Sequence, residues 1–415
     1  MNYIIGLCID KYRNKYGSRL LLFGIIINLI PLFYYKYWMF FLQTSNDLLL
    51  SLNLNNNFDI PKVVLLSGIS FFTFHSISYI IDIYNNKIKP SKSINDFGMY
   101  MSNFPQLIAG PIIRYSEIID QVSKRPFNIN QVLTGLFLFS LGLSMKIVIA
   151  DSSGSIADRI FSQPHADRVT LYAWVGALAY TLQIYFDFAG YSTMAIGLGR
   201  MMGFSFPENF NQPYRAKNIT EFWRRWHMTL SRWFRDYVYI PLGGNQSGNS
   251  QTLANLFVVF ILCGLWHGAS YTFVFWGLYH GVLLVIERVA SSKYNFTPSG
   301  FIGQLITFLL VIIGWIFFRS ENFSGALNYL HSMFSISGNI SQISEIYHVV
   351  IGPDKFLYLS LGLLFSFYPF EKINEKIQDD DSLIMVKSFC CLFLLFFSSV
   401  LIAANGFNPF IYFKF

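Results

Sequence analysis

The segment IGQLITFLLVIIGWIFF, Ile302–Phe318, carries no charged residue. A helix needs roughly 17 to 25 apolar residues to cross the hydrocarbon core of a bilayer, and this segment is long enough. Comparable apolar stretches occur at residues 20–41, 63–83, 131–150, 170–199, 253–287, 356–369 and 385–403. Lipid offers no hydrogen bonds to an exposed backbone, so continuously apolar runs of this length must fold as helices. The sequence therefore predicts an all-α, polytopic membrane protein.

The stretch 253–287 is too long for a single span. Gly264 and Gly268 interrupt it, so we expect a hairpin of two helices there. Counting this hairpin, the chain holds about nine transmembrane or re-entrant helices. No internal repeat or long linker divides it, and we expect one transmembrane domain over residues 1–415.

The overall composition agrees with a lipid environment. Hydrophobic residues make up 53% of the chain and charged residues 13%, a balance that does not suit a soluble surface. The net charge of +7 comes from basic residues beside the spans, where the positive-inside bias explains them without a nucleic-acid partner. By this bias residues 11–19 lie in the cytoplasm and residues 43–61 outside. The four cysteines lack the spacing of a metal site, and we expect no metal.

A polar and aromatic segment at residues 203–251 is too charged to span a membrane. Asn218 stands three positions before Glu221, the arrangement of a helix N-cap. Projection of a continuous helix over residues 218–238 gathers its large apolar side chains on one face and Arg224, Arg225, Arg232 and Arg235 on the other. We therefore predict an interfacial amphipathic helix with His227 at the margin of its apolar face. Its simplest role would be an anchor on anionic lipid headgroups.

Ionisable residues within spans are costly and indicate function. We single out His75, Asp187, His267 and His280. His75 and Asp187 could also be ordinary buried polar groups that tie helices together. His267 lies between two glycines in GLWHG, which leaves room for a ligand, and a neutral imidazole can take a proton from a hydroxyl group. From these residues alone, an enzyme and a transporter fit equally well.

Several motifs in a fixed order resemble those of the bacterial membrane-bound O-acyltransferases. The strongest is FNQPYRAKNITEFWRRWHMTLS, Phe210–Ser231. It is accompanied by AGPI at 109–112, YFDFAGYS at 185–192, WFRDYVYIPLGG at 233–244, LWHG at 265–268 and WGLYHG at 276–281. The resemblance covers residues 100–285 and points to the branch that acetylates alginate or peptidoglycan and D-alanylates teichoic acid. Relatives usually carry one or two spans before the element resembling residues 2–10, so we expect the amino terminus to be truncated relative to them.

The resemblance implies a ring of helices around a central tunnel, with His267 as the catalytic histidine and His227 as a second functional one. Asp187, His280 and Trp266 would line the tunnel. At the cytoplasmic mouth, Arg224, Arg225, Arg235 and Asn218 are candidates for binding the donor. Their competing role is contact with lipid phosphates.

The implied activity is O-acetylation at the bacterial cytoplasmic membrane. The donor would be acetyl-CoA or a carrier-protein thioester, with no tightly bound cofactor. The acceptor would be a polysaccharide, reached with an extracytoplasmic acetyltransferase partner. Direct transfer and an acyl-histidine intermediate both remain open. The alternatives are D-alanyl transfer toward teichoic acid and a transporter or flippase for a polysaccharide precursor.

Overall fold

The computed structural model describes residues 1–54, 57–123, 125, 128–165, 168–246, 248–335, 352–368, 384–406 and 408–411. Every regular element in those ranges is a helix, which confirms the all-α class. Six helical segments among the described residues are long and apolar enough to cross a membrane, fewer than the nine expected. Two predicted spans, α3 (Ile69–Tyr84) and α16 (Pro353–Phe367), have only 16 and 15 residues.

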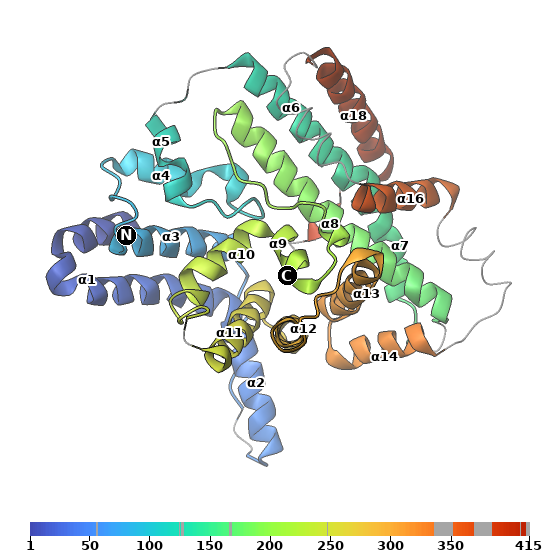
Figure 1. Cartoon of the computed structure of the whole chain (residues 1–415), viewed down its shortest axis with the longest axis horizontal. Helices are drawn as coiled ribbons and strands as arrows, with labels where there is room; N and C mark the ends of the chain where they lie inside the picture. The colour runs from blue at the N-terminus through green and yellow to red at the C-terminus, as the bar shows by residue number, and fades with distance from the viewer. Residues whose placement is uncertain are drawn as a thin grey trace.

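The chain begins with a helical hairpin. Helix α1 (Asn2–Leu32) kinks at Tyr12, and its two arms lie against each other, since the side-chain amides of Asn2 and Asn28 exchange hydrogen bonds of 2.8 and 2.9 Å. α3 packs on this hairpin (Figure 1). A π-helical turn, η1 (Phe33–Tyr37), continues into α2 (Trp38–Ser51), which extends away from the body of the molecule.

The long helix α8 (Thr170–Met201) runs through the middle of the structure against α6 (Ile129–Ser144) (Figure 1). The two helices approach closely because glycines face each other. A Cβ on Gly142 would lie 2.4 Å from the carbonyl oxygen of Gly190. Small residues of this kind let membrane helices pack backbone to backbone. The π-helical turn η3 (Met145–Ala150) and α7 (Asp151–Phe161) continue α6, and α18 (Ile384–Asn405) covers its outer side.

The predicted hairpin in residues 253–287 is confirmed as α11 (Asn249–His267) and α12 (Tyr271–Tyr294). Only Gly268 lies at the break, however, and Gly264 remains inside α11. A Cβ on Gly264 would lie 2.3 Å from the carbonyl oxygen of Phe273, so this glycine allows close packing rather than a bend. The chain continues into α13 (Gly300–Arg319) and α14 (Phe323–Phe334).

The predicted continuous helix over residues 218–238 is wrong. The segment forms α9 (Ile219–Arg225), α10 (Met228–Phe234) and the π-helical turn η6 (Arg235–Tyr239). His227 breaks the helix with left-handed backbone angles, φ 42° and ψ 54°. The break is stabilised from outside the segment, because the carbonyl oxygen of Asn209 accepts the N–H of Met228 at 2.8 Å.

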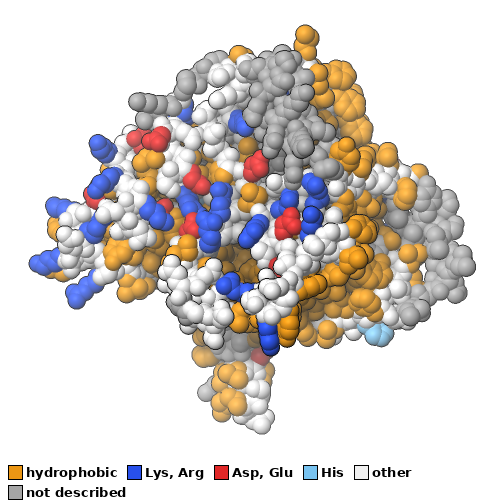
Figure 2. Space-filling model, viewed as in Figure 1, with side chains coloured by type: hydrophobic (Ala, Val, Ile, Leu, Met, Phe, Trp, Pro, Cys, Tyr) orange, Lys and Arg blue, Asp and Glu red, His pale blue; other side chains and the backbone are white. Residues whose placement is uncertain are grey.

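The large apolar side chains of this segment do not rest on a membrane surface. They are buried in the main hydrophobic core with residues of α8, α12 and α13. The buried side chains of the segment are those of Phe222, Trp223, Trp226, Leu230, Trp233, Phe234 and Tyr237. Arg224 and Arg235 are exposed, so the separation of apolar and basic side chains is correct. Figure 2 shows Lys and Arg side chains gathered over α1 and over the middle of the view, where α9 and α10 lie in Figure 1.

Candidate active site

His267 is the last residue of α11 and is 5% exposed. Its ring packs edge-to-face against Trp276 and Phe318, with centroid distances of 5.0 and 5.2 Å. It also lies 4.9 Å from the ring of Trp266. Side chains from α11, α12 and α13 therefore form an aromatic enclosure around the imidazole. Such edge-to-face contacts fix the orientation of a ring as well as burying it.

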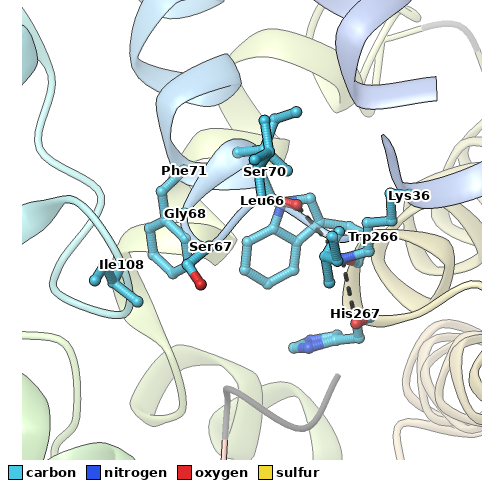
Figure 3. Close-up of a pocket in the computed structure, with 11 residues that line it drawn as sticks. Lys36, Leu66, Ser67, Gly68, Ser70, Phe71, Ile108, Trp266 and His267 are labelled. Carbon is cyan, nitrogen blue, oxygen red and sulfur yellow. Dashed lines mark hydrogen bonds between the residues drawn. The ribbon is translucent and has the colours of Figure 1, made fainter. Parts of the chain in front are cut away.

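A cavity of about 120 Å³ lies beside this enclosure and is lined by His267, Trp266, Lys36, Ile108 and residues 65–71. In the view of Figure 3, Ser67, Gly68 and Phe71 lie on one side of the Trp266 ring and Lys36 on the other. The His267 side chain extends beneath Trp266. The predicted tunnel residue Trp266 thus does line a cavity together with the predicted catalytic histidine.

His227 is fully buried and contacts the same tryptophan, with its ring 5.9 Å from that of Trp266. Its Nδ1 lies 2.9 Å from Oδ1 of Asn209. The backbone N–H of Thr229 also donates to this Asn209 atom, at 3.3 Å, which identifies it as the amide oxygen. An amide oxygen only accepts, so Nδ1 of His227 carries the proton and Nε2 carries the lone pair.

His227 lies outside the six spanning segments. Burial lowers its pKa to about 3, so the imidazole is neutral at physiological pH. Its Nε2 has no hydrogen-bond partner within the described ranges. The structure therefore brings both predicted functional histidines to Trp266, one of them with a defined basic nitrogen.

Asp187 occupies a different place from the His267 cavity. Its carboxylate pairs with Lys146 at 3.0 Å and accepts the backbone N–H of Ile411 at 2.7 Å. Lys146 also pairs with Asp151 at 2.5 Å. These groups line a second cavity of about 170 Å³, together with Asn408 of the C-terminal segment, which returns to the centre of the molecule (Figure 1). The two cavities share no lining residue, so Asp187 does not join the predicted catalytic pair.

The remaining embedded histidines, His75 and His280, are also fully buried. Neither ring nitrogen of either residue has a hydrogen-bond partner among the residues that the structure describes. His280 packs against Trp223 and Trp276, at 5.1 and 5.2 Å between ring centroids. It does not line the cavity of His267, although it touches the same enclosure through Trp276.

Residues 91–324 match the sequence model of MBOAT, the membrane-bound O-acyltransferase family, and this range includes both histidines at Trp266. The chain belongs to the membrane-bound O-acyltransferase family. It is 40% identical over 431 residues to "Probable alginate O-acetylase AlgI" of Pseudomonas putida, an alignment that covers 100% of this chain and 88% of the relative.

Two further relatives of this acyltransferase are named for different activities. The peptidoglycan O-acetyltransferase of Helicobacter pylori is 38% identical over 81% of this chain and 69% of its own length. The teichoic acid D-alanyltransferase of Bacillus subtilis is 29% identical over 75% of this chain and 81% of its own length. The family resemblance inferred from the motifs is thus confirmed.

Three of the four predicted donor-side residues of this O-acyltransferase bond to neighbouring acidic residues. Asn218 caps α9 as predicted, since its Oδ1 accepts the N–H of Glu221 at 2.7 Å. Arg225 pairs with Glu221 at 3.0 Å, and Arg235 pairs with Asp236 at 2.6 Å. Arg224 is exposed on the outer side of α9.

Asp236 accepts hydrogen bonds from two arginines, one of which is Arg235. Arg114 also pairs with it, at 2.7 Å. Burial alone would raise the pKa of the Asp236 carboxyl, but the hydrogen bonds from Arg235 and Arg114 outweigh burial and hold this pKa below its usual value. Asp236 is therefore ionised at neutral pH, and the arginines beside it are partly neutralised.

Sequence reasoning missed three polar residues of this acyltransferase. Lys36 and Lys146 lie inside the apolar stretches 20–41 and 131–150, so the criterion that selected Asp187 could have found them. Asn209, which orients His227, lies in a polar segment where no comparable sequence signal marks it.

Proposed function

We propose that the protein transfers an acetyl group from a cytoplasmic thioester to hydroxyl groups of an exported or cell-wall polysaccharide, working in the bacterial cytoplasmic membrane. The observation that carries this proposal is the imidazole of His267, enclosed by aromatic rings at the wall of a cavity. The relatives named for O-acetylation of alginate and peptidoglycan, at 40% and 38% identity, support the acetyl group and the polysaccharide acceptor.

In the proposed reaction, His267 acts as a general base. Its imidazole takes the proton of the acceptor hydroxyl while the hydroxyl oxygen attacks the thioester carbonyl carbon. The tetrahedral intermediate then collapses, the C–S bond breaks, and the imidazolium returns the proton to the departing thiolate. The hydroxyl group can belong to the polysaccharide or to an extracytoplasmic partner protein that completes the transfer, and the proton balance is the same in both cases.

Among the arginines on the proposed donor side, Arg224 is the best candidate for binding a phosphate. Arg224 is exposed. Arg235 is exposed as well but pairs with Asp236, and Arg225 pairs with Glu221. A guanidinium group recognises phosphate oxygens well, whether they belong to coenzyme A or to the prosthetic group of a carrier protein. Asn218 serves as a helix cap, so we assign it a structural role at this mouth.

The test is release of labelled acetate or its transfer from acetyl-CoA by the protein in lipid nanodiscs, with the acetyl thioester of a carrier protein as a second donor. We expect His267→Ala to lower turnover by roughly 10²- to 10⁴-fold, the usual contribution of a general base. His331→Ala is the matched control, because His331 is exposed on α14. If wild-type protein consumes neither donor even with its extracytoplasmic partner present, the proposal is refuted.

The same preparation distinguishes the proposed function from two alternative functions. A D-alanyl carrier thioester should be a poor donor, because the relative named for D-alanyl transfer is the more distant one at 29% identity. A transporter or flippase should keep working in His267→Gln, which retains the size of the side chain but not its basicity. Loss of function in that variant supports the acyltransferase.

A further inference from the structure

Lys36 is a cation inside the first apolar stretch and lies in the π-helical turn η1, between α1 and α2. An ammonium group within a spanning segment is costly, so its retention needs a partner that offsets the cost. The Lys36 side chain reaches across to α11, whose end lies 231 residues further along the chain. It also lines the cavity that contains His267 (Figure 3).

The partners of Lys36 are the last carbonyl groups of α11. Its Nζ donates to the carbonyl oxygen of Trp266 at 2.5 Å and to that of His267 at 3.3 Å. A third contact, at 3.4 Å, reaches Oγ of Ser70. The neighbouring Tyr37 donates its hydroxyl hydrogen to the carbonyl oxygen of Leu265 at 2.9 Å. Two successive side chains of η1 thus satisfy three successive carbonyl groups.

These carbonyl groups need outside donors because α11 ends at His267. The last four carbonyl groups of any helix lack an intrahelical partner, and bulk water does not replace it where the end is buried in the protein, as Trp266 and His267 are. The C-terminal end of a helix also carries partial negative charge, which a cation complements and a neutral side chain does not. The direct contact with the carbonyl group of His267 couples Lys36 to the residue that carries the imidazole.

We propose that Lys36 is a positioning residue of the acyl-transfer site: its ammonium group fixes the end of α11, and thereby the backbone of His267, so that the imidazole is held at the cavity wall. This inference rests on the proposed function. Lys36 lies outside residues 91–324, the range that matches the family's sequence model. The amino-terminal helices would then complete the site and not serve only as membrane anchors.

The experiment compares acetyl transfer by wild type, Lys36→Met and Lys36→Arg in lipid nanodiscs, with kcat and the donor KM measured separately. Methionine keeps most of the length of the side chain but has neither a charge nor a hydrogen-bond donor, whereas arginine keeps the charge and the donors. We expect Lys36→Met to lower kcat by roughly 10- to 100-fold, as for a misplaced catalytic group, with the donor KM within about twofold. Lys36→Arg should recover a substantial part of kcat. Lys62→Met, at an exposed lysine, is the matched control and should behave as wild type.

Lys36→Met at wild-type kcat would overturn the positioning role. A fall in kcat that follows loss of folded protein, with no recovery in Lys36→Arg, would overturn it too, because it would show a purely structural cap. If Lys36→Met does not accumulate as folded protein, Lys36→Gln replaces it, and wild-type kcat in that uncharged variant has the same meaning. Failure of wild type to consume either thioester refutes the proposed function instead, so the two failures are distinguishable.

Discussion

The buried side-chain amide of Asn209 fixes the orientation of His227 through hydrogen bonds, and its removal tests how much these bonds stabilise the fold. Oδ1 of Asn209 accepts from Nδ1 of His227 at 2.9 Å, from Oγ1 of Thr229 at 2.8 Å and from the backbone N–H of Thr229 at 3.3 Å. Nδ2 donates to Oγ of Ser192 at 3.0 Å. Both His227 and Thr229 are almost completely buried, so no bulk water replaces these bonds.

In Asn209→Ala, the Nδ1–H of His227, the backbone N–H of Thr229 and the hydroxyl group of Thr229 lose their acceptor. The hydroxyl group can rotate toward another acceptor, so we count only the two N–H groups. A buried donor left without a partner costs about 1–3 kcal/mol, so these two together cost about 4 kcal/mol. One kcal/mol shifts the melting temperature by roughly 2–4 °C in chains of 150–250 residues and by roughly half as much in this chain of 415 residues, which gives a fall of roughly 4–8 °C here. Acetyl transfer should fall as well, because the left-handed break at His227 loses part of its support.

The assay is thermal unfolding of the detergent-solubilised protein, monitored by size-exclusion chromatography of heated samples. Asn209→Asp keeps an acceptor for His227 and should recover part of the loss. Asn95→Ala, at an exposed asparagine on α4 (Ile94–Ser102), should melt as wild type does. If Asn209→Ala melts within about 1 °C of wild type, these bonds do not stabilise the fold and the assigned tautomer of His227 loses its support.

Two further predictions concern packing and pH. In Gly264→Ala the added Cβ would lie 2.3 Å from the carbonyl oxygen of Phe273. We therefore expect the free energy of unfolding to fall by about 1–3 kcal/mol, which would be measured as a lower melting temperature. An unchanged melting temperature would contradict the close approach of α11 and α12. Asp236 has a folded-state pKa below its unfolded value, so its contribution to stability is present above the unfolded value of about 3.9 and is lost as pH falls through the folded pKa. Asp236→Asn should therefore lower the melting temperature more at pH 7 than at pH 3, and an equal effect at both pH values would refute this.

Much of the fold could be predicted from the sequence because lipid leaves the backbone few choices. An uncharged run such as Ile302–Phe318 must be helical, and the structure has a helix at residues 300–319. The position of His267 was also accessible. Gly264 and Gly268 interrupt the apolar stretch 253–287, which places the histidine close to the turn between two helices.

The break at His227 could not be predicted in the same way. Local periodicity favours one helix over residues 218–238, and the apolar and basic faces separate correctly under that assumption. The hydrogen bonds that compete with a continuous helix come from Asn209, 18 residues before the histidine. Its side-chain oxygen accepts from the His227 ring and its carbonyl oxygen accepts from the N–H of Met228. The same periodicity predicts that the aromatic face lies on the membrane, but Phe222 and Trp226 are buried in the protein core, because the break lets both halves of the segment turn inward.

The two histidines differ in how their positions are stabilised, and this difference bears on mechanism. His227 takes its orientation from Asn209, which lies within residues 91–324 of the family match. His267 is held by the aromatic rings of α12 and α13 on one side and, through its backbone, by Lys36 on the other. A shift of η1 relative to α11 would therefore move His267 and leave the support of His227 intact. Substitutions in the amino-terminal helices should accordingly alter kcat through the geometry of His267, while the tautomer of His227 stays the same.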